Sequence, residues 1–208
     1  MDACRAKLRQ GLNALTLEID EFQLEALLKF IRLMVKWNQA YNLTAVRDPL
    51  AMVAIHLLDS LAVLPHIEAP RVADIGTGAG LPGIPLAICL PDQHFVLVDS
   101  NAKKTRFVRQ VAMELKLNNV EVVHSRVELF KADALFSTVI SRAFAGMADI
   151  VKLTEHLLAD GGVLLAMKGQ RPEQELVELK TAYSVIPIKA PGIDAERCLI
   201  RVERHRHG

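Results

Sequence analysis

The sequence predicts an α/β fold in which a seven-stranded, mostly parallel sheet ends in an antiparallel hairpin and follows a helical N-terminal segment. From residue 71 onward, short apolar segments alternate with helical patterns, which is typical of a parallel sheet with helices on both faces. The last two apolar segments are joined by a stretch containing Pro191 and Gly192 that is too short for a crossover helix. These two strands are therefore expected to pair antiparallel.

The N-terminal third of the chain is predicted to be helical. Asp20 and Gln23 have the spacing of a capping box, and apolar residues follow at helical intervals to about Trp37. No strand pattern appears before residue 71. Residues 1–66 are therefore expected to form a helical cap, and residues 67–208 the domain that binds a ligand.

The strands and helices of the second part are predicted in strict alternation. Strands are expected at residues 71–75, 94–98, 120–124, 137–140, 163–167, 184–188 and 198–202. Helices are expected at residues 83–90, 103–117, 148–158 and 173–182. Turn-forming residues are predicted to end the first three of these helices, namely Pro91, Asn118-Asn119 and Asp160-Gly161-Gly162.

Composition predicts one main domain with neither a metal nor a membrane partner. The chain has 208 residues, of which 51% are apolar and 24% are charged. Its net charge of +1 does not by itself indicate a polyanionic partner. The three cysteines, Cys4, Cys89 and Cys198, are scattered, which argues against a disulfide framework or a zinc site. No segment approaches the roughly 20 apolar residues that span a bilayer. A cytoplasmic monomer is the expectation.

A glycine-rich turn follows the first predicted strand and opens the first helix of the α/β part. Gly76, Gly78 and Gly80 carry no Cβ and tolerate positive φ, so the backbone can approach a nucleotide-like ligand closely. Gly78, Gly80 and Gly83 also match G-x-G-x-x-G, which keeps a nicotinamide dinucleotide open as an alternative ligand. A seven-stranded sheet with a terminal hairpin is instead typical of methyltransferases.

Residues just after the predicted strands are the candidates for ligand contact, because ligands lie across the carboxyl ends of such sheets. Asp99 follows the second strand, where an acid can accept both ribose hydroxyls. Val127 and Glu128 follow the third, where their amides can meet an adenine edge. Asp74, at the end of the first strand, is expected either to face the ammonium group of an amino-acid moiety or to cap the turn.

The fourth predicted strand is followed by Ser141-Arg142-Ala143-Phe144, which lacks the Asn/Asp-Pro-Pro-aromatic run of enzymes that methylate exocyclic amines. No cysteine stands at a strand end to attack a pyrimidine. A nucleobase that accepts the methyl group should therefore already carry a free lone pair, as guanine N7 does. Catalysis would then come from in-line placement of the reacting groups and from a favourable electrostatic field. Arg142 is expected near both the cofactor and the target base, contributing charge and placement without proton transfer.

Basic residues near the glycine turn form a candidate RNA contact. Lys103, Lys104 and Arg106 begin the helix after the second strand, and Lys168 follows the fifth strand. We expect them to guide phosphates, with a merely solvated helix face as the alternative.

His56 and Asp59 share a helix face farther upstream. They can form an acid/base pair, but capping and packing is the favoured interpretation.

Motifs along nearly the whole chain resemble one family. They are Trp37-Asn38, Asn42-Leu43-Thr44, His56-x-x-Asp59-Ser60, the segment Asp74 to Pro85, Leu97-Val98-Asp99-Ser100, Lys103-Lys104, Ser125-Arg126-Val127-Glu128, Ser141-Arg142-Ala143 and Lys168-Gly169. The chain resembles the small-subunit ribosomal RNA guanine-N7 methyltransferases once named glucose-inhibited division protein B. The resemblance implies a Rossmann-like fold and methyl transfer from S-adenosylmethionine to N7 of the guanine at position 527 of 16S ribosomal RNA.

The resemblance also implies cofactor contacts at Gly76, Leu81, Val127, Glu128 and Arg142. The small ribosomal subunit or its RNA is the implied partner. Two alternatives remain open from the residues alone: a dinucleotide-dependent oxidoreductase, and a non-catalytic RNA-binding assembly factor.

Overall fold

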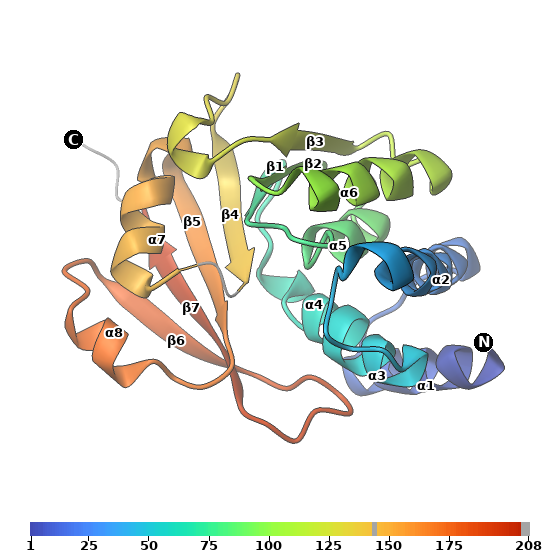
Figure 1. Ribbon diagram of the computed structural model, residues 1–208. Helices are drawn as coiled ribbons and strands as arrows, with labels where there is room; N and C mark the ends of the chain where they lie inside the picture. Colours follow the sequence, from blue (N-terminus) through green and yellow to red (C-terminus); the bar gives the residue numbers. More distant parts are fainter. Residues whose placement is uncertain (143–144, 205–208) are drawn as a thin grey trace.

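A computed structural model describes residues 1–142 and 145–204 and contains a seven-stranded sheet with the order β3-β2-β1-β4-β5-β7-β6 (Figure 1). The strands are β1 (Arg71–Ile75), β2 (His94–Asp99), β3 (Val120–His124), β4 (Phe136–Arg142), β5 (Leu158–Lys168), β6 (Tyr183–Ile188) and β7 (Arg197–Glu203). Strands β1 to β5 pair in parallel, whereas β7 pairs antiparallel with both β5 and β6. The predicted sheet and its terminal hairpin are confirmed.

The strand order places the switch point of the sheet between β1 and β4. From β1 the chain moves outward through β2 to β3, and then returns to the other side of β1 as β4. Ligands of doubly wound sheets bind at the carboxyl ends of the strands near this point. The sequence there is the glycine turn after β1 and Arg142 at the end of β4.

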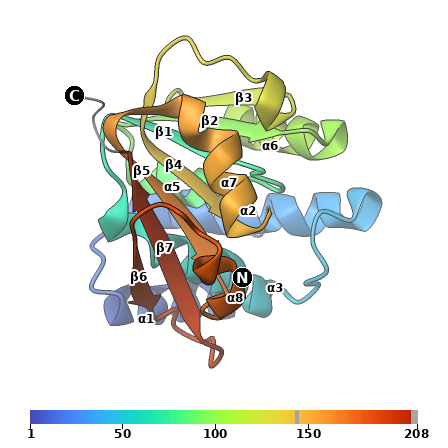
Figure 2. The ribbon, with the colours of Figure 1, turned by 90° about the vertical axis from the view of Figure 1, so that its left-hand side faces the viewer.

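Helices cover both faces of the sheet (Figures 1 and 2). One face carries α5 (Gly83–Cys89), α6 (Ala102–Glu114) and the N-terminal helices, and the other carries α7 (Met147–Thr154) and α8 (Glu173–Val177). The N-terminal elements are α1 (Asp2–Ala14), α2 (Glu21–Tyr41), α3 (Pro49–Met52), the π-helical turn η1 (Val53–Leu58), α4 (Asp59–Leu61) and the short 3-10 helix η2 (Leu64–His66). Two further 3-10 helices are η3 (Val127–Leu129) and η4 (Glu155–Leu157).

The N-terminal helices share a hydrophobic core with the sheet. The rings of Phe30 and Trp37 on α2 lie with their centroids 6.3 and 5.6 Å from that of Phe107 on α6, and all belong to one apolar cluster with β1 and β2. Burial of aromatic side chains of this size stabilises a fold by a few kcal/mol each, about 25 cal/mol per Å² of apolar area. A continuous core therefore crosses the division predicted at residue 66, which itself stays a prediction.

One helical stretch among the described residues, Pro49–His66, is apolar and long enough to cross a membrane. It is 61% buried inside the fold. Most of its apolar side chains pack in the core with α1, α2 and α5, whereas Leu50 and Ile55 are exposed.

Several predicted helix ends are wrong by a few residues. Helix α2 continues one turn past Trp37 because Asn42, in the left-handed region at φ 49°, closes it. Helix α6 ends before Asn118-Asn119, since Lys116 already adopts φ 54°. Helix α8 stops at Val177, because it buries only Leu176 and so lacks an apolar face long enough to support more turns.

The predicted helix stop at Asp160-Gly161-Gly162 is also wrong, because these residues lie inside strand β5. Gly161 has φ +76°, and the pairing between β4 and β5 shifts register beside it. A Cβ on Gly162 would lie 2.8 Å from the Phe136 carbonyl oxygen. The glycines therefore form an irregularity in the strand that lets β5 extend back to Leu158.

Candidate functional site

The glycine turn after β1 is organised by a buried carboxylate. Asp74 is fully buried, and its Oδ2 accepts hydrogen bonds from the Thr77 hydroxyl at 2.6 Å and the Gly83 amide at 2.8 Å. Burial raises the pKa of Asp74 to about 6, although both hydrogen bonds act to lower it. The sequence predicts that Asp74 either faces the ammonium group of a ligand or caps the turn, and these two hydrogen bonds cap the turn.

Two glycines of the turn are required by packing against the core. A Cβ on Gly80, at φ +83°, would lie 2.6 Å from Ile84 Cγ1, and one on Gly83 would collide with Leu97. The Leu81 side chain is only 4% exposed and belongs to the core. If Gly80 and Leu81 contact a cofactor, as predicted, they do so through their backbone.

A pocket of about 300 Å³ lies at the carboxyl ends of β1, β2 and β3. It is lined by four of the predicted cofactor residues, Gly76, Asp99, Val127 and Glu128, together with Ile75, Val98, Ser100, Lys104, Ser125 and Arg126. Its volume is at the lower end of the range for small-molecule sites, about 300–1,000 Å³. The structure thus brings the ends of three strands into one site, which we call the Asp99 pocket.

Asp99 links this pocket to the glycine turn. Its Oδ2 accepts from the Gly78 amide at 2.8 Å, and its Oδ1 accepts from the Asn101 amide at 2.7 Å. An ionised carboxylate has about four acceptor sites, so each oxygen retains capacity for a ligand hydroxyl. Across the pocket, Val127 and Glu128 begin η3, and the first amides of a helix have no partner within it.

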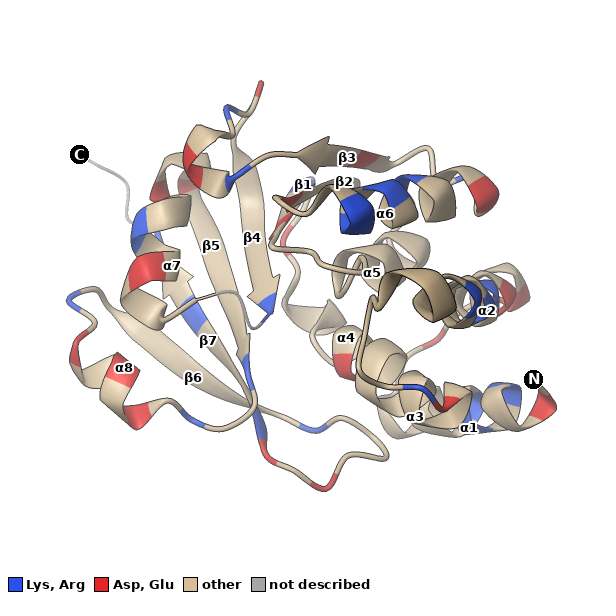
Figure 3. Ribbon diagram, viewed as in Figure 1, with Lys and Arg blue, Asp and Glu red and all other residues tan. Residues whose placement is uncertain are grey.

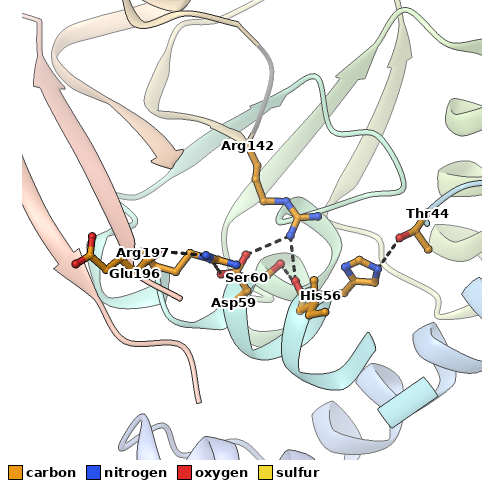
Figure 4. Close-up of polar contacts among 8 residues, drawn as sticks. Thr44, His56, Asp59, Ser60, Arg142, Glu196 and Arg197 are labelled. Atoms are coloured by element: carbon orange, nitrogen blue, oxygen red, sulfur yellow. Dashed lines mark hydrogen bonds and ion pairs between the residues drawn. The ribbon is translucent and has the colours of Figure 1, made fainter. Parts of the chain in front are cut away.

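Arg142 lies in a second cavity, of about 340 Å³, on the other side of the switch point. Its Nη1 donates to the Ile55 carbonyl and to Asp59 Oδ2, both at 3.3 Å. Arg197 Nε donates to the other oxygen of the same carboxylate at 3.0 Å (Figure 4). We call this second space the Arg142 cavity.

Sequence reasoning missed Arg197. A signal was present, because Arg197 opens the second strand of an antiparallel hairpin, and such a strand begins at the edge where the parallel strands end.

His56 does not pair with Asp59. Its Nε2 lies 3.0 Å from the Thr44 hydroxyl, and the residue is only 5% exposed (Figure 4). Burial, assisted by the Arg142 charge, lowers the pKa of His56 to about 4. A neutral, packed imidazole agrees with the favoured prediction and argues against an acid/base pair.

The predicted basic residues occupy two different places. Figure 3 shows basic residues in blue along α6. Lys103 and Arg106 are exposed on this helix, and Lys104 lines the Asp99 pocket. Lys168 instead lines the Arg142 cavity, where its Nζ donates to Glu175 at 2.8 Å and to the Ala145 carbonyl at 3.1 Å. Lys168 therefore does not extend the patch on α6, and its role in RNA binding stays a prediction.

The segment after β4 is described only in part. Ala143 and Phe144, which belong to the motif after the fourth strand, lie outside the described residues. Among residues 1–142 and 145–204, no three His, Cys, Asp or Glu side chains come together in a way that could hold a metal ion. The cysteines Cys4, Cys89 and Cys198 are free.

Comparison with known proteins assigns the family. The model of the rRNA small subunit methyltransferase G family, GidB, matches residues 23–196. The chain belongs to this family. Proteins named ribosomal RNA small subunit methyltransferase G include relatives from Chromobacterium violaceum, 49% identical over 95% of this chain and 96% of the relative, and from Methylobacillus flagellatus, 50% identical over 93% and 95%.

Solved structures agree with the family on the fold. A methyltransferase from Geobacter sulfurreducens superposes with a TM-score of 0.60 at 14% identity, covering 86% of this chain and 89% of that one. The N-methyltransferase NodS from Bradyrhizobium japonicum, in complex with S-adenosyl-L-homocysteine, gives 0.56 at 14% identity, covering 82% and 99%. The chain thus has the Rossmann-like methyltransferase fold that its sequence predicts.

Proposed function

We propose that this chain transfers a methyl group from S-adenosylmethionine to N7 of the guanine at position 527 of 16S ribosomal RNA. Membership of the rRNA small subunit methyltransferase G family carries the proposal. The partner is then the small ribosomal subunit or its RNA, and the place of action the cytoplasm. A monomer with a helical cap over residues 1–66 stays part of the proposal.

The Asp99 pocket has the chemistry that this cofactor needs. The Asp99 carboxylate can accept ribose hydroxyls, as the sequence predicts, and its bonds to the Gly78 and Asn101 amides hold it in place. Gly78 adopts φ +59°, a conformation that glycine tolerates and that lets its amide point to the Asp99 carboxylate. When bound, S-adenosylmethionine would supply an electrophilic methyl group on its sulfonium.

Guanine N7 has a lone pair and no proton, so the reaction needs no base from the protein. His56 is consistent with this, since a pKa of about 4 makes its buried imidazole a weak base. Placement and the positive field of Arg142 are the contributions that we assign to the chain. Arg142 thus acts on the acceptor side, next to the end of β1.

The test combines binding with mapping of the modification. Titration with S-adenosylmethionine and with NADH should show binding of the former alone, and NADH binding alone would favour an oxidoreductase. Mapping of N7-methylguanine in 16S RNA should show the mark in cells that contain the protein and its loss in a deletion strain. Persistence of the mark without the protein would favour a non-catalytic assembly factor.

Two substitutions test the residues. Asp99→Asn should weaken S-adenosylmethionine binding by about 10- to 150-fold, the effect of losing one charged hydrogen bond of about 1.5–3 kcal/mol. Arg142→Ala should reduce methyl transfer. If Arg142→Ala leaves both cofactor affinity and methylation near wild type, the role assigned to Arg142 is wrong.

A further inference from the structure

The Asp99 pocket and the Arg142 cavity lie on either side of the boundary between β1 and β4 at the switch point. Strand β1 pairs with β4 so that Asp74 stands beside Ile140, and the Ser141 hydroxyl donates to the Ile75 carbonyl at 2.9 Å. Neighbouring strands lie about 4.8 Å apart, so the residue after Ser141 begins its side chain close to the end of β1. A group transferred from one pocket to the other therefore has only the β1/β4 boundary to cross.

The Arg142 cavity is lined by both apolar and charged side chains. Ile55, Met167 and Ile188 supply apolar side chains, whereas Asp59, Arg142 and Arg197 supply the charges. One carboxylate facing two guanidinium groups leaves a net charge of +1, because Lys168 is already paired with Glu175. The apolar side chains suit the faces of a nucleobase, and the net positive charge suits the phosphates beside it.

Asp59 is the residue that binds both Arg142 and Arg197. Its side chain is only 8% exposed, whereas those of Arg142 and Arg197 are 23% and 25% exposed. A carboxylate this deeply buried is costly unless its partners are fixed, and here each oxygen takes one guanidinium. Figure 4 shows Arg142 reaching Asp59 from above and Arg197 reaching it from the left. Arg142 ends β4 and Arg197 begins β7.

The π-helical turn contributes a second anchor to Arg142. The Asp59 amide donates to the Ala54 carbonyl, one residue farther back than in an α-helix. The Ile55 carbonyl, which an α-helix would pair with the Asp59 amide, accepts instead from Arg142 Nη1. The π-helical turn thus frees a backbone carbonyl that holds Arg142 in the cavity. Such turns are frequent at functional sites.

We propose that Asp59 is a positioning residue for the RNA: it holds Arg142 and Arg197 as a pair in the lining of a cavity that receives the purine base to be methylated. The inference rests on the proposed function. Arg197 is assigned to the phosphate beside that nucleotide, and Arg142 to the base. Asp59 itself touches neither, and its effect passes through the geometry of the two guanidinium groups.

Asp59→Asn tests this assignment. An amide has one acceptor oxygen, so it can satisfy only one of the two arginines and presents its NH₂ group to the other. The KM for small ribosomal subunits that lack the N7-methyl mark should rise about tenfold or more, as expected for a broken buried charge pair. The Kd for S-adenosylmethionine should stay within about twofold, because Asp59 does not line the Asp99 pocket.

The control is Glu68→Gln, which breaks the 2.7 Å pair between Arg201 and Glu68, a carboxylate that is 40% exposed. Arg201 has a side-chain exposure of 24%, close to that of Arg142 and Arg197, but it lies along β7 away from the cavity. This variant should leave the KM for subunits at the wild-type value. Asp59→Glu, which restores a carboxylate, should recover part of the loss.

Arg197→Gln provides a second route if Asp59→Asn does not fold. It removes one arginine and leaves Asp59 paired with Arg142, and it should raise the KM for subunits without changing the Kd for S-adenosylmethionine. Equal KM values for wild type, Asp59→Asn and Arg197→Gln would overturn this inference alone. Absence of methyl transfer by the wild-type chain would overturn the proposed function and this inference with it.

Discussion

His56 makes the stability of the protein depend on pH in a direction that can be calculated. The imidazole is buried beside Arg142, and its pKa is about 4 in the folded chain against 6.5 when exposed. Unfolding therefore takes up a proton at pH values between these two pKa values. The free energy of unfolding is at its full value above pH 6.5 and falls as the pH drops from 6.5 towards 4.

The magnitude follows from the size of the pKa difference. A difference of about 2.5 units, at 1.36 kcal/mol per unit, corresponds to about 3.4 kcal/mol over the whole range. Between pH 7 and pH 5 the expected loss from His56 alone is roughly 2 kcal/mol. Other groups titrate in the same range, so the quantity to measure is the difference between wild type and a variant that lacks the imidazole.

Urea unfolding of wild type and His56→Gln at pH 7 and pH 5 measures this difference. Glutamine keeps a polar partner for the Thr44 hydroxyl but does not titrate. Wild type should lose roughly 2 kcal/mol more than the variant on acidification. Thr44→Val, which removes the 3.0 Å contact but keeps the imidazole, should retain the pH dependence of wild type. Parallel losses in wild type and His56→Gln would refute a buried, neutral His56.

Three further predictions concern the glycine turn and the first long helix. Gly83→Ala should destabilise the fold by about 1–3 kcal/mol in urea unfolding, because its Cβ would collide with Leu97 and lie 2.7 Å from Asp74 Oδ2. The control Gly161→Ala has open space around its Cβ and should cost only about 1 kcal/mol, because of its positive φ. Equal losses of stability in the two variants would contradict the packing argument. Asp74→Asn should remove a pH dependence opposite to that of His56: the folded pKa of about 6 lies above the ordinary 3.8, so wild type should lose roughly 1 kcal/mol relative to the variant as the pH rises from 5 to 7. Asp20→Ala should cost about 1 kcal/mol through loss of the capping box, measured as a lower urea midpoint at an unchanged slope.

The order and type of the main elements could be read from the sequence because they depend on local patterns. Alternating apolar and helical segments predicted all seven strands, and the Asp20 capping box forms as predicted. Helix ends were less predictable, since a left-handed residue such as Lys116 or a strand extension at Gly161 depends on neighbouring chain segments. Local propensity does not contain those contacts.

The glycine turn and Asp99 were likewise determined by the sequence, because their spacing along the chain follows from one strand, one turn and one helix. The tertiary structure decided the rest. It turned Gly80 and Leu81 towards the core and paired Lys168 with Glu175. It also joined Asp59 to Arg142, which lies 83 positions farther along the chain, and to Arg197, which lies 138 positions farther. No pattern within one element predicts such a meeting, because the order of strands in the sheet and the antiparallel return of β7 bring these residues together.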